Sequence, residues 1–252
     1  MADRVLVSAD ELFGDGVFET VHLRPSGPWL LDAHLDRLAR SAELLDLELP
    51  PRAEIEERVR AEIAGWEAPE GALRILHTRE SLHVTVSPIA PATLAERRDG
   101  IRLLSADVGY ALGRRPPWSL TAAKSLSYAG NFAARRWARR QGADDVVWLS
   151  TEGYALEAPT ASLIWLAGSA LATVPADMTG ILPGTTAAEL LARAPSVGLR
   201  GEERMVTIDE LAGADAIWLA SALRGLAEAV SLDGVHRTRS PWTPQLLTLL
   251  GY

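Results

Sequence analysis

The sequence predicts an α+β protein with two domains, a smaller N-terminal α+β domain over residues 1–112 and a larger C-terminal domain over residues 113–252. In the first half, some segments alternate apolar with polar residues and others repeat apolar residues at helical spacing. The second half holds mostly short β-rich runs separated by turn residues, a pattern typical of antiparallel strands. Between them, the segment GYALGRRPP at Gly109–Pro117 contains residues that break both kinds of element, so we place the domain junction there.

The N-terminal part predicts a strand, two helices and a pair of strands, in that order. GVFETVHL at 16–23 alternates in the manner of a half-buried strand. Residues 31–47 then place leucines and alanine at three- and four-residue spacing, which predicts an amphipathic helix, and a second helix is expected over 52–66. Two further strands, 72–78 and 81–89, are separated by a short polar turn.

The C-terminal part predicts short strands with a few helices between them. A helix from about residue 127 to 141 is ended by Gly142. The segment TTAAELLARA at 185–194 opens with hydroxyl groups, as a capped helix does. The remaining expected elements are strands over 144–150, 151–160, 161–168, 170–175, 214–221 and 226–234, and a closing helix over 243–250.

Composition excludes several classes of protein. With 48% hydrophobic and 23% charged residues the chain is globular, and a net charge of −8 argues against a general nucleic-acid binder. No apolar run reaches the roughly 18 to 20 residues that span a bilayer, and Asp3 and Arg4 stand where a secretion signal needs an apolar core. The absence of cysteine excludes disulfides and thiolate metal sites. We therefore expect a cytoplasmic protein that binds neither membrane, nucleic acid nor metal.

Lys124 is the most informative single residue. Lysine and arginine together number 25, yet every one except Lys124 is arginine. On a solvated surface the two are nearly equivalent, but a guanidinium cannot form a Schiff base with a carbonyl and an amine can. The pattern favours a chemical role for Lys124, although at this point one lysine left by chance stays an alternative.

Six segments in sequence order resemble one enzyme family. The chain is similar to the fold type IV pyridoxal phosphate enzymes, which include branched-chain and D-amino acid aminotransferases and 4-amino-4-deoxychorismate lyase. The resemblance implies a two-domain fold like that of D-amino acid aminotransferase. The segments are FGDGVFET (13–20), HLDRL (34–38), AKSLSYAGN (123–131), STEGYALEAPTASLIW (150–165), GILPGTT (180–186) and ADAIWLASALRGL (214–226).

The resemblance implies pyridoxal 5'-phosphate as cofactor and assigns roles to two charged residues besides Lys124. Lys124 would be the catalytic Schiff-base lysine. Glu157 would face the pyridine nitrogen through a charge-assisted hydrogen bond, worth roughly 1.5 to 3 kcal/mol. Arg37 would grip the phosphate through paired donors, although Arg37 or Arg40 could each be a solvated helix residue.

Further cofactor and substrate residues follow from the same resemblance. Thr185 and Thr186 open an expected helix and would bind phosphate there, a geometry that plain N-capping shares. Ser221 would add a further phosphate contact. Tyr128 would lie near the cofactor, with a core position as the alternative. Arg79 is a candidate for the substrate carboxylate.

The reaction that the resemblance favours is 4-amino-4-deoxychorismate lyase, which gives 4-aminobenzoate and pyruvate in the folate branch. A transaminase of branched-chain or D-amino acids is the alternative, because Lys124 and Glu157 would serve both reactions. A non-catalytic pathway partner on the same fold is a third possibility. The family resemblance also implies a homodimer acting on a small-molecule substrate.

Overall fold

The computed structural model describes residues 7–114 and 116–252. Asp3, Arg4 and residue 115 of the expected junction lie outside these residues. The described chain forms two compact units, the first containing the residues through Ile89 together with Leu120–Ala129, and the second containing Ala90–Ser119 and Gly130–Tyr252. The units are thus made of interleaved segments. The division at 112/113 into two continuous domains stays a prediction.

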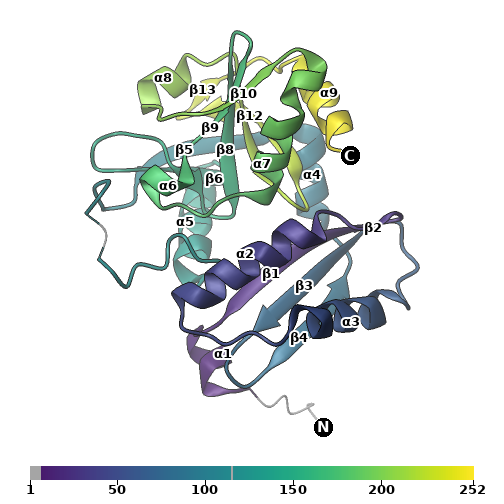
Figure 1. Cartoon of the computed structure of the whole chain (residues 1–252). Helices are drawn as coiled ribbons and strands as arrows, with labels where there is room; N and C mark the ends of the chain where they lie inside the picture. The colour runs from purple at the N-terminus through teal and green to yellow at the C-terminus, as the bar shows by residue number, and fades with distance from the viewer. Residues whose placement is uncertain (1–6, 115) are drawn as a thin grey trace. The chain divides into compact units, whose positions relative to one another are not determined.

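The first unit is a four-stranded antiparallel sheet in the order β2-β1-β3-β4, with helices α2 and α3 on one of its faces (Figure 1). Residues Val17, Val21 and Leu23 of β1 pack with Leu35 and Leu38 of α2 in its core. The elements are α1 (Ala9–Phe13), β1 (Val17–Arg24), β2 (Gly27–Pro28), α2 (Leu31–Leu44), α3 (Arg52–Ile63), β3 (Gly71–His77) and β4 (Leu82–Ser87).

The expected helices of this unit end earlier than their apolar pattern suggested. Helix α2 ends at Leu44 instead of continuing to residue 47, because Asp46 adopts a left-handed backbone with φ 51° that stops the helix. Helix α3 ends at Ile63, three residues before the expected end. Helix α1 was not predicted, since it has only five residues and buries none of them.

The second unit is built on a nine-stranded mixed sheet, whose main path runs β10-β9-β8-β11-β12-β5-β6. Most neighbouring strands are antiparallel, as expected, but β5 pairs in parallel with β6 and β12, and β10 with β9. Its strands are β5 (Ile101–Asp107), β6 (Asp145–Leu149), β7 (Glu157–Ala158), β8 (Ala161–Ala167), β9 (Ala170–Thr173), β10 (Arg200–Glu203), β11 (Ala216–Ser221), β12 (Gly225–Leu232) and β13 (Val235–His236).

The helices of this unit cover the sheet and connect its strands. They are α4 (Pro91–Asp99), α5 (Ala129–Arg140, which starts on the last residue of the first unit), α6 (Ala176–Thr179), α7 (Thr185–Arg193), α8 (Ile208–Ala212), α9 (Trp242–Leu249) and the 3₁₀ helix η1 (Ala194–Val197). Among the described residues no helix has both the length and the apolar character needed to cross a membrane.

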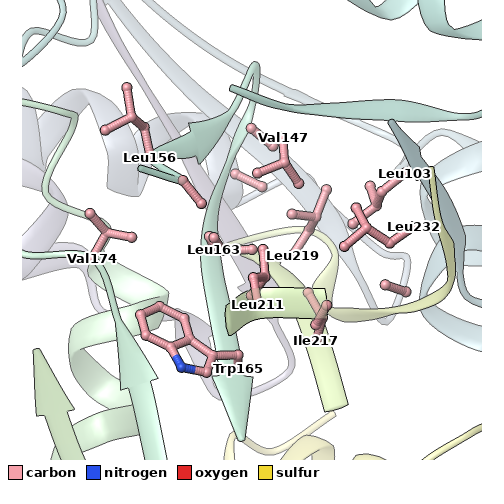
Figure 2. Packing of buried hydrophobic residues seen from close by; sticks show 14 of the residues in the cluster. Leu103, Val147, Leu156, Leu163, Trp165, Val174, Leu211, Ile217, Leu219 and Leu232 are labelled. Carbon is pink, nitrogen blue, oxygen red and sulfur yellow. The ribbon is translucent and has the colours of Figure 1, made fainter. Parts of the chain in front are cut away.

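A large apolar cluster forms the main core of the second unit, beside a smaller cluster around Ala138, Ala143 and Val146. Figure 2 shows Leu163 and Trp165 of β8 packed with Leu219 of β11 and with Leu103 and Leu232 from the neighbouring strands. Trp165 is completely buried. Strands β8 and β11 carry several of these core residues. The candidate residue Ser221 ends β11, and Glu157 lies on β7, which pairs with β8.

Two expectations for this unit were wrong in detail. The segment 151–160 is mostly turn and contributes only the two-residue strand β7, and helix α5 starts at Ala129 rather than at residue 127. Helix α4 and strand β5 were not predicted.

Candidate functional site

The segment around Lys124 pairs with the N-terminal part of β1, since β2 pairs with that strand only at Leu23 and Arg24. The backbone N–H of Phe18 donates to Lys124 O at 2.9 Å, and Leu126 N–H donates to Gly16 O at 2.8 Å. Val17 and Ser125 face each other in an antiparallel bridge. Although it follows the first 119 residues, the segment is therefore fixed on the first strand of the first unit.

Two aromatic rings define the surroundings of the Lys124 side chain. Its Nζ lies 4.4 Å from the centroid of the Phe18 ring and donates a hydrogen bond to the Tyr128 hydroxyl at 3.2 Å. The rings of Phe18 and Tyr128 meet edge to face at 5.0 Å. The amine is thus held by one ring face and one hydroxyl, rather than extending into solvent as an ordinary surface lysine does.

Arg37 lies on α2 in a buried ion pair with Glu19. Its Nε donates to Glu19 Oε1 at 2.7 Å and its Nη2 to Oε2 at 2.8 Å, while His34 Nδ1 lies 2.7 Å from the same Oε2. Glu19 occupies the face of β1 that also carries Val17 and Val21, toward α2. The carboxylate holds the guanidinium in one orientation, and any phosphate contact would be made by a side chain fixed in advance.

The electrostatics of this group favour an ionised carboxylate beside a neutral imidazole. Burial alone would raise the pKa of Glu19, but the charge of Arg37 and the hydrogen bonds from Arg37 and His34 lower that pKa to about 2. Burial lowers the pKa of His34, and the nearby Arg37 and Lys124 charges lower it further against the opposing effect of Glu19. His34 therefore donates from Nδ1 to an ionised Glu19 at neutral pH.

Arg79 forms an exposed ion pair near the turn before β1. Its Nη1 donates to Asp15 Oδ2 at 2.6 Å, and both side chains are about half exposed. Gly16, next to Asp15, packs closely against His77 and Leu126. A Cβ at this position would lie only 2.7 Å from His77 O and from Leu126 Cδ1. A substrate carboxylate at Arg79 would have to share the guanidinium with Asp15. The substrate role of Arg79 stays a prediction.

In the second unit, strand register places Glu157 beside Ser162. Glu157 of β7 is the cross-strand partner of Ser162, and Ser162 is in turn the partner of Ala220 on β11. Directly opposed side chains in antiparallel strands point to the same face. Ser221 follows Ala220 at the end of β11, so its side chain points to the opposite face of the sheet. Glu157 and Ser162 therefore share one face of the sheet.

The N-terminus of α7 lies against the same serine. Gly184 is the N-cap residue, and a Cβ there would overlap Ser162 Oγ, so only glycine allows this approach. Thr186 is buried, and its hydroxyl Oγ1 has no hydrogen-bond partner among the residues that the structure describes. A buried hydroxyl without a partner, in the first turn of a helix whose dipole attracts anions, fits a phosphate group.

The expected residues therefore fall into two groups, one in each unit. Lys124, Tyr128 and Arg37 belong to the first unit, and Glu157, Thr185, Thr186 and Ser221 to the second. Sequence reasoning assigned no role to Phe18, Glu19, Ser41 or Ser162. Glu19 carried a signal that could have found it, because it is an acidic residue at an inward position of an alternating strand.

A family comparison identifies the chain. The model of the family described as amino-transferase class IV matches residues 16–232. The chain belongs to the class IV aminotransferase family. A bifunctional aminodeoxychorismate lyase / D-amino acid transaminase of Mycobacterium tuberculosis is 35% identical, over 94% of this chain and 89% of the relative.

Solved structures of the family share the fold. A hypothetical aminotransferase from Mycobacterium tuberculosis in its PLP-bound form has a TM-score of 0.93 at 34% identity, covering 99% of this chain and 93% of its own. A fold IV transaminase from Curtobacterium pusillum has a TM-score of 0.92 at 38% identity, covering 99% and 88%. These likenesses confirm the fold type IV, two-domain α+β architecture and pyridoxal phosphate as the cofactor of this class IV enzyme.

Proposed function

We propose that the chain is a 4-amino-4-deoxychorismate lyase, which converts its substrate to 4-aminobenzoate and pyruvate. In this enzyme Lys124 would hold the cofactor. The observation that carries the proposal is the placement of the single lysine, fixed on β1 by its backbone and directed by Phe18 and Tyr128. The similarity to a bifunctional lyase and transaminase supports the choice of reaction. We also propose that the enzyme acts in the folate branch and that it is located in the cytoplasm.

The residues of the first unit would bind and orient. Pyridoxal phosphate, when bound, supplies an aldehyde for the amine and an electron sink for the substrate carbon. Lys124 Nζ would take the proton from the amino-bearing carbon of the substrate, whose ring becomes aromatic as pyruvate leaves in its enol form, and the enol would then take up a proton. The Tyr128 hydroxyl accepts from Nζ and so sets the direction of that amine. Arg37, held by Glu19, would bind the phosphate.

The residues of the second unit would hold the ring and the phosphate. Glu157 would accept a hydrogen bond from the pyridine nitrogen and keep it protonated, which strengthens electron withdrawal by the ring. Thr186 Oγ1 and the first turn of α7 would bind phosphate oxygens, with Thr185 and Ser221 as further contacts.

A substitution at Lys124 tests the assignment of the lysine. The Lys124→Ala protein is expected to fold, because the backbone bonds of the segment remain, but to lose the visible absorbance of the bound cofactor and all turnover. The measurement is a visible spectrum of purified protein with added pyridoxal phosphate. Arg58→Ala is the control, since Arg58 is an exposed cation of α3. An unchanged visible band in Lys124→Ala would refute the proposal.

D-amino acid transamination is the second candidate, favoured by the bifunctional relative. The two reactions differ in their requirements, because the lyase releases pyruvate from aminodeoxychorismate without a keto acid and the transaminase needs one as amino acceptor. Parallel assays with aminodeoxychorismate alone, and with D-alanine plus α-ketoglutarate, separate them. A visible band with neither activity would point to another substrate. No band at all would favour the non-catalytic partner.

A further inference from the structure

The inference concerns Ser41, a buried serine of α2 that contacts the backbone of Lys124. Ser41 is 1% exposed, and its Oγ accepts a hydrogen bond from Lys124 N–H at 3.0 Å. The two residues are 83 positions apart in the sequence. A side-chain hydroxyl in a helix usually bonds within its own helix or to water. Here it reaches the main chain of the lysine.

The bond marks the point where the pairing with β1 changes. In a continuous antiparallel ladder, Phe18 and Lys124 would exchange both of their backbone hydrogen bonds. Phe18 N–H donates to Lys124 O as the ladder requires, but Lys124 N–H donates to Ser41 Oγ. The N–H of Lys124 therefore donates its hydrogen bond to a side chain of α2 and not to the backbone of β1.

Helix α2 links this contact to the candidate phosphate residue. Arg37 and Ser41 are four residues apart and so lie on the same face of α2, separated by one helical turn. Arg37 joins that face to β1 through Glu19, and Ser41 joins it to the Lys124 segment. One rigid helix therefore sets where the guanidinium lies relative to the amine. Displacement of a reacting group by about 1 Å can cost roughly 100-fold in rate.

We propose that Ser41 is a positioning residue for Lys124, whose hydroxyl holds the lysine backbone in the orientation that presents Nζ to the cofactor. The inference rests on the proposed function of Lys124. Ser41 itself touches neither reacting atom, so its loss should alter how well the amine is placed and leave substrate binding nearly unchanged. The expected signature is a fall in kcat with a constant KM, together with a changed pH midpoint of the visible cofactor band.

The test compares three substitutions at Ser41 in the holoenzyme. Ser41→Ala removes the acceptor, Ser41→Cys keeps the volume but provides a weaker acceptor, and Ser41→Thr keeps the hydroxyl. We expect kcat to fall about tenfold in Ser41→Ala and less in Ser41→Cys, with KM within twofold and the pH midpoint of the visible band shifted in both. Ser41→Thr should restore the wild-type midpoint. Ser41→Cys keeps the test decisive if Ser41→Ala does not fold.

Ser150→Ala is the matched control, because Ser150 is also a buried serine whose hydroxyl accepts a backbone N–H, from Tyr154 at 3.4 Å in the second unit. It should show a loss of melting temperature similar to that of Ser41→Ala, with an unchanged kcat and midpoint. The inference is overturned if the Ser41 variants match Ser150→Ala in both readouts. If Lys124→Ala keeps the visible band, the proposed function itself has failed. If Lys124→Ala loses the visible band but the Ser41 variants keep the wild-type kcat and pH midpoint, the inference about Ser41 is wrong and the proposed function still stands.

Discussion

At the scale of single residues, the buried Glu19 is a charged group on which stability depends. Its carboxylate is fully buried between Arg37 and His34. Removing one partner of a buried ion pair leaves the other charge uncompensated, which costs about 3 to 5 kcal/mol. We expect Glu19→Gln to lower the free energy of unfolding by that amount in a denaturant titration. The Glu54→Gln control breaks the exposed Arg58–Glu54 pair and should change stability little.

The same pair gives stability a defined acid dependence. The pKa of Glu19 is about 2 in the folded protein, against an ordinary value of 4.5. The folded state therefore binds this proton more weakly than the unfolded state, so the stabilisation is complete above pH 4.5 and is lost as pH falls toward 2. The stability difference between wild type and Glu19→Gln should shrink across that window. A constant difference would contradict the assigned ionisation.

At the scale of elements, the first turn of α7 is expected to bind phosphate with a hydroxyl that the apoprotein does not use. Thr186→Val removes a buried Oγ1 that has no partner within residues 7–114 and 116–252, so the apoprotein should be equally or more stable. The lost bond to a charged phosphate should raise the Kd for pyridoxal phosphate about tenfold or more.

A neighbouring threonine provides the opposite outcome as a control. Thr179 is buried too, but its Oγ1 donates to Pro175 O at 2.6 Å. Thr179→Val should therefore destabilise the apoprotein and leave the affinity for pyridoxal phosphate unchanged. Calorimetric titration of both variants, with thermal unfolding of the apoproteins, separates the two effects. Equal cofactor affinities in the two variants would exclude Thr186 as a phosphate ligand.

Elements with a strong local pattern could be predicted from the sequence, and those defined by distant partners could not. Strand β1 and helices α2 and α7 follow from alternation, helical spacing and hydroxyl-rich starts. Strand β5 lies beside β6 and β12 in parallel pairs that no local pattern encodes. The position of Lys124 was conspicuous in composition. Its contacts with Phe18 and Ser41 depend on pairing across about a hundred residues.

At the scale of the whole molecule, the homodimer stays a prediction. The first unit exposes the apolar side chains of Leu12 and Phe13 on α1, at 68% and 78%. Exposed neighbouring apolar residues often mark an interface. We expect sedimentation equilibrium at micromolar concentration to give twice the mass of the chain, and Phe13→Ser to weaken the association. Val235→Ser, at an exposed position on β13, is the control, and a monomeric wild type would end this prediction.

The interleaving of the two units has a consequence for synthesis on the ribosome. The chain emerges from its N-terminus, yet the edge of β1 is completed only by the segment that contains Lys124. That segment leaves the ribosome after Ala90–Ser119, which belong to the second unit. During synthesis, part of β1 in the first unit therefore stays unpaired until Ala90–Ser119 of the second unit and then the Lys124 segment have been made. The segment Leu120–Ala129, which carries Lys124, is the last part of the first unit to be synthesised.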